Sequence, residues 1–147
     1  MREILFRGKR MDSGQWVEAA SILSANDGLV KEIYLSAKSG AVLHVNADGN
    51  PVAVSAAPHA LFYQVDPDTV GQFTGLTDKN GRKIFEGDVC RFYGDDGFSD
   101  YAVFWDGNNS GWLVRQMDSE ALDVLDSYFA ECCTVIGNIH DNPELLG

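Results

Sequence analysis

The sequence predicts a mainly β protein: an N-terminal β subdomain over residues 1–68, then a small SH3-like barrel or meander over residues 69–147 that carries one short helix. Short runs rich in Val, Ile and aromatic residues recur along the chain, separated by Gly, Asp and Asn turns. Such runs, with apolar and polar residues alternating, are typical of strands in sandwiches and barrels. With 147 residues, 45% of them hydrophobic, the chain is long enough to bury a core without disulfides or a structural metal.

The N-terminal subdomain is expected to consist of β-hairpins. Apolar runs of strand length precede and follow short turn sequences rich in Gly, Asp and Asn. Pro67 interrupts regular pairing and restricts the residue before it, which places a subdomain boundary near residues 65–68. The strands predicted before this boundary cover residues 3–7, 15–19, 32–35, 42–45 and 52–54.

The C-terminal subdomain begins with the clearest hairpin pattern in the chain. Asn80 and Gly81 lie between apolar runs at residues 72–76 and 83–85. Asn-Gly is a preferred hairpin tip because such turns need positive φ, which glycine adopts without a Cβ clash. We therefore predict a tight hairpin with Gly81 at positive φ. Further strands are predicted over residues 89–93, 101–105, 112–116 and 134–139.

One helix is predicted, over about residues 119–131. Asp118 or Ser119 can cap its N-terminus, because their side chains accept hydrogen bonds from the first free backbone N–H groups. Pro143 is expected at the first position of a terminal helical turn. The apolar residues that fall on one face of the predicted helix are Leu122, Leu125, Phe129 and Cys132.

Three segments resemble the YopX family of phage and prophage proteins. They read REILFRG at residues 2–8, VDPDTVGQFTGLTDKNGRKIFEGDV at residues 65–89 and VIGNIHDNPELL at residues 135–146. The central segment is long and specific, and the three together span the chain. The resemblance implies a largely phage- or prophage-encoded protein without an established activity. It supplies no catalytic residues.

Negative charge is concentrated in the C-terminal part of the chain. Residues 1–85 contain nine Lys and Arg against nine Asp and Glu, whereas residues 86–147 contain two basic residues, Arg91 and Arg115, against thirteen acidic ones. A phosphate backbone is repelled by such a surface, because nucleic-acid affinity depends on Lys and Arg displacing counterions. The acidic part serves solubility, or it meets a basic partner.

The cysteines predict a reducing compartment. An odd number of cysteines, Cys90 and the adjacent Cys132 and Cys133, does not fit a secreted disulfide framework. No apolar run approaches the length of a membrane span, and the first residues lack the apolar core of a signal peptide. We expect the cytoplasm of a bacterial host cell.

No catalytic, cofactor-binding or metal-binding residues are predicted. A Cys90 or Cys133 nucleophile with His140 as its base is weighed against buried structural cysteines, which are favoured. The histidines and cysteines have no zinc-ligand spacing. The paired acids Asp95 with Asp96, and Glu86 with Asp88, flank turn glycines and are interpreted as solvated turn residues.

The leading functional hypothesis is a non-enzymatic phage or prophage accessory protein that acts through protein–protein contacts. Its C-terminal part contains an aromatic set that is mostly core but leaves one strand face able to bind a peptide or protein. That set is Tyr93, Phe98, Tyr101, Phe104, Trp105 and Trp112. The alternative is a nucleic-acid-associated module of phage DNA metabolism. It requires six basic residues to converge on one face: Arg2, Arg7, Lys9, Arg10, Arg82 and Lys83.

A homo-oligomer is also expected, formed through the less charged N-terminal part. Residues 1–85 balance to zero net charge, so self-association there meets no net repulsion. The strands predicted at residues 42–45 and 52–54 offer an open edge for symmetric pairing.

Overall fold

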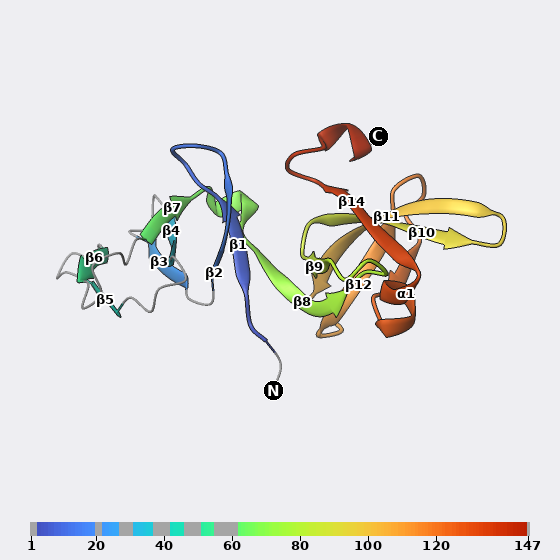
Figure 1. Cartoon of the computed structure of the whole chain (residues 1–147), viewed down its shortest axis with the longest axis horizontal. Helices are drawn as coiled ribbons and strands as arrows, with labels where there is room; N and C mark the ends of the chain where they lie inside the picture. Colours follow the sequence, from blue (N-terminus) through green and yellow to red (C-terminus); the bar gives the residue numbers. More distant parts are fainter. Residues whose placement is uncertain are drawn as a thin grey trace. The chain divides into compact units, whose positions relative to one another are not determined.

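Two compact units, Glu3–Gln72 and Phe73–Gly147, make up the chain. The computed structural model describes residues 3–19, 22–26, 31–36, 42–45, 51–54 and 62–146. Strands dominate both units, which confirms the mainly β prediction (Figure 1). No helix in the described ranges is long and apolar enough to cross a membrane.

The first unit is built from antiparallel pairs. Strands β1 (Phe6–Lys9) and β2 (Trp16–Ala19) form the predicted hairpin. Strands β5 (Val42–Val45) and β6 (Pro51–Val54) pair where a hairpin was predicted. The side chains of these last two strands lie outside the described residues, so oligomerisation through them stays a prediction. A further sheet has the order β3 (Ile22–Asn26), β4 (Lys31–Ser36), β7 (Phe62–Val65).

The core of the first unit lies under the β1–β2 hairpin. Ala19 and Val65 are fully buried there, and Phe6, Val17 and Val70 pack against them. The short 3₁₀ helix η1 (Pro67–Thr69) follows, capped by the preceding aspartate. Residues 65–70, where the sequence predicted a boundary, therefore pack into the core of the first unit.

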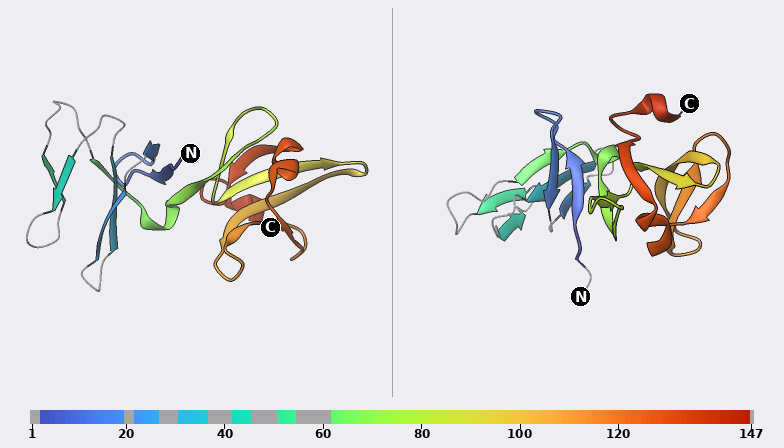
Figure 2. Two further views of the ribbon diagram at one scale, coloured as in Figure 1. Left: turned by 90° about the horizontal axis from the view of Figure 1, so that it is seen from below. Right: turned by 45° about the vertical axis from the view of Figure 1, so that its right-hand side comes forward.

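Strand β8 (Gly71–Thr77) opens the second unit. Its first two residues pair with β1, and from Phe73 onward it pairs with β9 (Lys83–Phe85). A sheet of five antiparallel strands follows, in the order β13 (Leu122–Val124), β12 (Gly111–Gln116), β11 (Gly97–Asp106), β10 (Asp88–Gly94), β14 (Cys133–Asn138). The tip of the β10–β11 hairpin projects beyond the neighbouring strands (Figure 2).

The five-stranded sheet is an open meander and not a closed SH3-like barrel. Its two outer strands, β13 and β14, do not pair with each other. Strand β13 has only three residues, and the outer side of β14 is bonded to the loop between β8 and β9. The meander alternative of the sequence prediction is therefore the one observed.

The predicted helix is present but shorter than expected. Helix α1 spans Ser127–Glu131 and is capped by Asp126, whose carboxylate accepts a hydrogen bond from the Phe129 N–H. The predicted start near residue 119 is wrong, because residues 122–124 form strand β13 on β12. The terminal turn is confirmed, with Pro143 opening the 3₁₀ helix η2 (Pro143–Leu146).

The inward face of the five-stranded sheet packs against α1 and the β8–β9 hairpin. Alternate residues of β10 and β11 supply this core, among them Cys90, Tyr101 and Val103. The ring of Tyr101 meets Phe129 of the helix edge-on, with centroids 5.2 Å apart. The buried residues of the cluster are Ile84, Cys90, Val103, Val114, Leu125, Phe129, Ala130, Cys133 and Val135.

The hairpin tip at Asn80-Gly81 is formed as predicted, and Gly81 has a φ of 81°. A Cβ added there meets nothing within 4 Å, so the only cost of a side chain is backbone strain. Gly81→Val is therefore expected to lower the free energy of unfolding by about 1 kcal/mol. An unchanged unfolding midpoint in urea would contradict this expectation.

Candidate functional site

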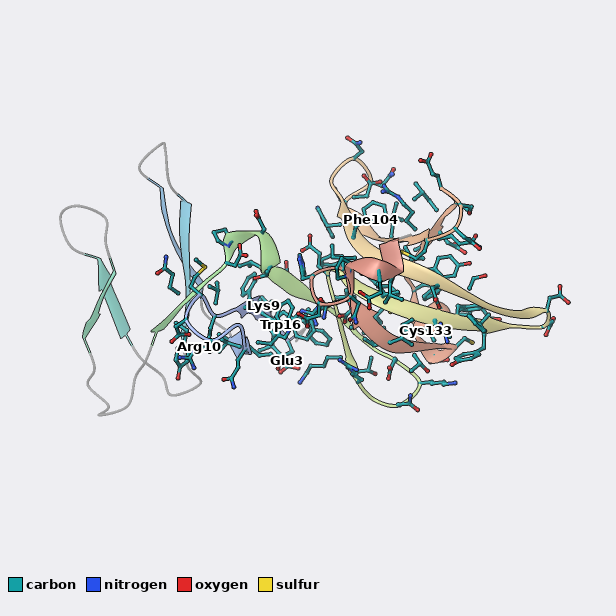
Figure 3. All side chains as sticks on the ribbon, turned by 90° about the horizontal axis from the view of Figure 1, so that it is seen from above. Glu3, Lys9, Arg10, Trp16, Phe104 and Cys133 are labelled. Atoms are coloured by element: carbon teal, nitrogen blue, oxygen red, sulfur yellow. The ribbon has the colours of Figure 1, made fainter. Side chains whose placement is uncertain are left out.

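The five-stranded sheet has a second face, opposite the core, which we call the outward face. Its membership follows from the cross-strand register, because residues directly opposite each other point to the same side. Arg91 faces Asp100, and Ala102 lies between Val89 and Arg115. Figure 3 shows all the side chains and labels Cys133 from the inward face and Phe104 from the outward face. The outward face further includes Tyr93, Phe98, Leu113, Leu122 and Val124.

Exposed apolar side chains gather on the outward face. Among the described residues, the second unit exposes six large apolar side chains. Four of these lie on the outward face: Tyr93 (47% exposed), Phe98 (58%), Leu122 (55%) and Val124 (55%). Single exposed hydrophobic residues are normal, but several on one sheet face are typical of an interaction surface.

Both arginines of the acidic part of the chain lie on this face, each over a phenylalanine. The Arg91 guanidinium carbon is 3.9 Å from the Phe98 ring centroid, and that of Arg115 is 5.1 Å from the Phe104 centroid. Arg91 also makes a two-pronged ion pair with Asp100, with distances of 2.8 Å and 3.0 Å. The hydrogen bonds to Asp100 raise the pKa of Arg91, which stays charged.

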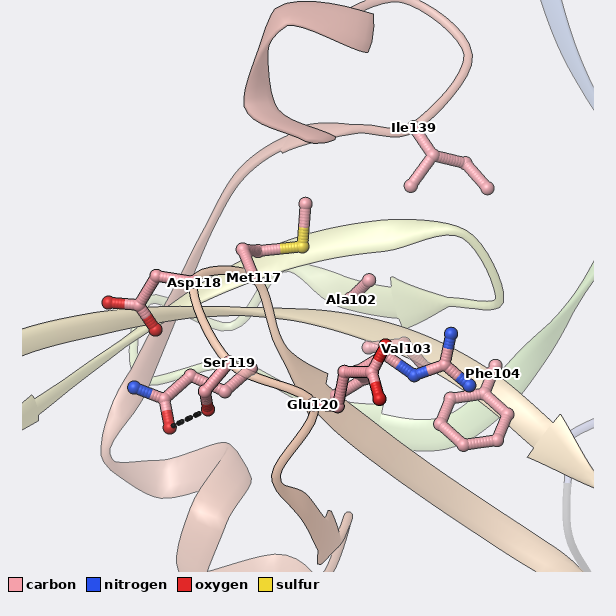
Figure 4. Close-up of a pocket in the computed structure, with 10 residues that line it drawn as sticks. Ala102, Val103, Phe104, Met117, Asp118, Ser119, Glu120 and Ile139 are labelled. Carbon is pink, nitrogen blue, oxygen red and sulfur yellow. Dashed lines mark hydrogen bonds between the residues drawn. The ribbon is translucent and has the colours of Figure 1, made fainter. Parts of the chain in front are cut away.

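A hollow of about 530 Å³ lies at one end of the outward face (Figure 4). Its apolar lining comes from Ala102 and Phe104 of β11, from Met117 and from Ile139. Asp118 and Glu120, in the connection between β12 and β13, place two exposed carboxylates on its wall. The Ser119 hydroxyl donates to Gln116 Oε1 over 3.1 Å, which ties this connection to the end of β12.

The two edges of the sheet are closed to strand addition. At β14, the Val135 N–H donates to Asp78 Oδ2 over 2.9 Å, and the Lys79 N–H donates to the Cys133 carbonyl over 3.1 Å. At β13, the outward-pointing Val124 N–H donates to Asp123 Oδ1 over 2.8 Å. Strand addition needs a row of unpaired backbone groups, and these bonds interrupt that row at both edges.

The cysteines weighed as nucleophiles lie in the core. Cys90 and Cys133 are fully buried in the same cluster. A hydrogen bond with Cys133, together with burial, raises the pKa of the Cys90 thiol. The raised pKa suppresses the Cys90 thiolate that nucleophilic attack would require. His140 lies elsewhere in the unit, against Gly87, in the segment that follows β14.

The prediction that both acidic pairs are solvated turn residues is confirmed for Asp95 and Asp96 and wrong for Asp88. Asp95 and Asp96 are exposed at the tip of the β10–β11 hairpin. Asp88, by contrast, is 1% exposed and accepts a hydrogen bond from the Phe85 N–H over 2.8 Å, so it closes the turn between β9 and β10. Among the described side chains, no group of three or more His, Cys, Asp or Glu residues is placed so that it could hold a metal ion. His44 and His59 lie outside those side chains.

The basic residues that a nucleic-acid module requires are divided between the two units. In the first unit, Arg7 and Lys9 both lie over the Trp16 ring, at 4.7 Å and 5.9 Å from its centroid. Arg10 pairs with Asp12 and lies over the Tyr63 ring. Arg82 and Lys83 belong to the second unit, and Arg2 lies outside the described residues.

Sequence reasoning missed two features of this region. Leu122 and Val124 were assigned to a helix, so their place on the outward face was not foreseen. The stacking of Arg91 and Arg115 on phenylalanines was not foreseen either, although both lie in strands of period 2, which fixes their face once the register is known.

The family model described as YopX protein matches residues 5–147. The chain belongs to the YopX family. The fold of this YopX-family chain is also similar to that of protein EF1440 from Enterococcus faecalis, as seen in its crystal structure. The two chains have a TM-score of 0.54 and 23% sequence identity over 100% of each chain, a likeness that shows the fold alone. A comparison with curated proteins finds no match.

Proposed function

We propose that this YopX-family chain is a non-enzymatic accessory protein of a phage or prophage, and that it binds another protein through the outward face of its second unit. The observation that carries the proposal is the set of exposed apolar side chains on one sheet face, with arginines stacked between them. Aromatic residues and arginine are the side chains most enriched at protein interfaces. The free cysteines fit the proposed location in the bacterial cytoplasm.

Charge favours a protein over a nucleic acid as the partner. Residues 73–147 contain five Lys and Arg against fourteen Asp and Glu, a net charge of −9. Phosphate contacts supply most of the affinity of nucleic-acid-binding proteins, and this balance opposes them. Of the two basic residues that follow residue 85, Arg91 is neutralised by Asp100.

A binding role also accounts for the chemistry of the unit better than catalysis does. A nucleophile needs a base within hydrogen-bond reach and access to substrate. The candidate thiols are enclosed in the core, and Asp88 is engaged with backbone. The accessible groups on the outward face are instead apolar rings, aliphatic side chains and a guanidinium.

Photo-crosslinking in the host cell tests the proposal. A photoreactive phenylalanine analogue at position 98 is expected to capture one discrete host or phage protein, and the same analogue in place of Met11, an equally exposed residue of the first unit, is expected not to. Leu122→Asp should reduce capture at position 98 by about tenfold or more, because it places a charge in an apolar interface.

The control is Met11→Asp, which should leave capture at position 98 unchanged. Thermal unfolding of each variant separates loss of the surface from loss of the fold. Equal capture at positions 11 and 98, or capture that Leu122→Asp does not change while the fold is intact, would rule out the outward face as the binding surface.

A further inference from the structure

The outward face also indicates the class of partner that binds it. We propose that its partner is a basic amphipathic helix of another protein, with apolar side chains against the sheet and Lys or Arg along both sides. This inference rests on the proposed function and names the partner class of the same surface. It is carried by the closed edges, the length of the apolar face and the carboxylates around it.

The closed edges decide how a partner is seated. An extended peptide joins a sheet by hydrogen-bonding to an open edge. Here the β14 edge is bonded to Asp78 and Lys79, and the β13 edge to Asp123. A partner therefore lies across the face, and the element that buries an apolar sheet face in this way is a helix or a second sheet.

The length of the apolar face fits a short helix. Tyr93 on β10 and Leu122 on β13 are three strands apart in the sheet order, which corresponds to roughly 14 Å at about 4.8 Å per strand. Leu122 is level with Val89 in the register, four residues along β10 from Tyr93, which adds roughly 13 Å along the strands and makes the diagonal roughly 20 Å. A helix of about thirteen residues spans that distance at 1.5 Å per residue. Its apolar residues at i, i+3, i+4 and i+7 form one stripe, which matches the diagonal from Tyr93 and Phe98 to Leu122 and Val124.

Carboxylates at both ends of the face set the charge of the partner. Asp95 and Asp96 lie at the β10–β11 tip, and Asp118 and Glu120 lie on the wall of the hollow. All four are exposed. Basic residues on the sides of the helix meet these acids, whereas a nucleic acid or an acidic helix is repelled.

The hollow gives the helix its anchor. A bulky side chain entering it meets Ala102, Phe104, Met117 and Ile139, and a Lys or Arg one turn away on the helix reaches Asp118 or Glu120. Anchors of this kind, an apolar group in a desolvated pocket beside a charge pair, carry most of the free energy of typical interfaces.

Three synthetic peptides of about 18 residues, labelled for fluorescence anisotropy, test the inference on the full chain. One carries Leu and Trp on one helical face and Lys elsewhere, the second has Glu in place of Lys, and the third keeps the lysines but has Ser in place of Leu and Trp. The first is expected to bind about tenfold or more tighter than the other two, and to weaken several-fold between about 0.05 M and 0.5 M salt. Its amide shift changes should map to the outward face.

Matched charge variants complete the test. The double variant Asp118→Asn, Glu120→Gln should lower the affinity for the lysine peptide by about threefold or more and reduce the salt dependence of its binding. The control double variant Glu131→Gln, Glu144→Gln removes two exposed carboxylates away from the hollow and should change affinity less than about twofold.

Equal or tighter binding of the glutamate peptide would overturn the basic partner, and so would a shift map away from the outward face. Either result leaves the crosslinking test of the proposed function standing by itself. If the protein captured at position 98 joins the face through an extended strand, the helix is wrong and the protein-binding surface is right.

Discussion

Asp78→Ala is expected to lower the free energy of unfolding of the second unit by about 2–4 kcal/mol, because it leaves a buried backbone N–H without its acceptor. The Asp78 carboxylate is 5% exposed and accepts hydrogen bonds from three backbone N–H groups. Those of Asn80 and Arg82 lie in the hairpin turn, at 2.9 Å each. The third, Val135, lies on β14 at 2.9 Å. One side chain thus fastens the β8–β9 hairpin to the edge of the five-stranded sheet.

Chemical unfolding followed by the fluorescence of Trp105 and Trp112 measures this loss, and the exchange rate of the Val135 amide locates it. Asp106→Ala is the matched control: Asp106 is also a turn aspartate that accepts a backbone N–H, from Asn108, but at an exposed site. It should cost less than about 1 kcal/mol, because water replaces the lost acceptor. Similar losses in the two variants, or unchanged exchange at Val135, would show that Asp78 does not connect the hairpin to β14.

The stabilisation from Asp78 is expected to depend on pH in one direction. Burial opposes its ionisation, but the backbone N–H groups of Val135, Arg82 and Asn80 outweigh burial and lower the pKa of the carboxyl below its usual value near 4. The stabilisation is therefore fully present above the unfolded pKa and is lost as the pH falls through the folded one. The stability gap between the wild-type protein and Asp78→Asn should narrow below about pH 4.

The hairpin around Gly81 was predictable and the role of Asp78 was not, for one physical reason. An Asn-Gly tip between apolar runs is a local pattern, and its geometry follows from φ alone. The hydrogen bond from Val135 to Asp78 joins residues 57 apart in sequence. Local patterns identify Asp78 as a turn residue, but they do not show which distant strand its second oxygen reaches.

The error at residues 119–126 has a similar origin. Leu122 and Leu125 fit helical spacing with Phe129, but pairing with β12 decides the structure of the first part. There Leu122 faces solvent while Leu125 enters the core. Helical spacing over so few residues is a weak preference, and cross-strand hydrogen bonds to a neighbouring strand override it.

The outward face was half predictable. Alternation along β11 correctly separates Ala102 and Phe104 from Tyr101 and Val103. Which of the two sets is covered depends on where α1 and the β8–β9 hairpin pack, and period-2 patterning carries no information on that when both sets are apolar. The charge count likewise predicts an acidic C-terminal part. It does not show that Arg91 and Arg115 share one face.

Gly137→Ala is the second change with a large expected effect, about 1–3 kcal/mol of stability. A Cβ at this position would lie 2.9 Å from Asn142 Cγ and 3.4 Å from Leu145 Cδ1. Asn142 belongs to the segment that folds back on the end of β14: its Oδ1 accepts the Asn138 N–H over 3.2 Å, and its own N–H donates to the Asn138 carbonyl over 2.9 Å. The methyl group therefore has to displace that segment.

A double-mutant cycle separates this clash from an effect on β14 itself. If the Asn142 side chain is the obstacle, Gly137→Ala should cost less stability when Asn142→Ala is already present. The loss in the double variant should then be smaller than the sum of the two single losses by about 0.5 kcal/mol or more. Gly107→Ala, at a turn glycine whose added Cβ meets nothing within 4 Å, should be close to neutral. Additive losses would place the cost of Gly137→Ala in the strand. A sub-additive cycle would place the cost in the packing of the C-terminal segment. That segment begins at Ile139, which lines the hollow of the outward face and whose N–H donates to the Gly87 carbonyl.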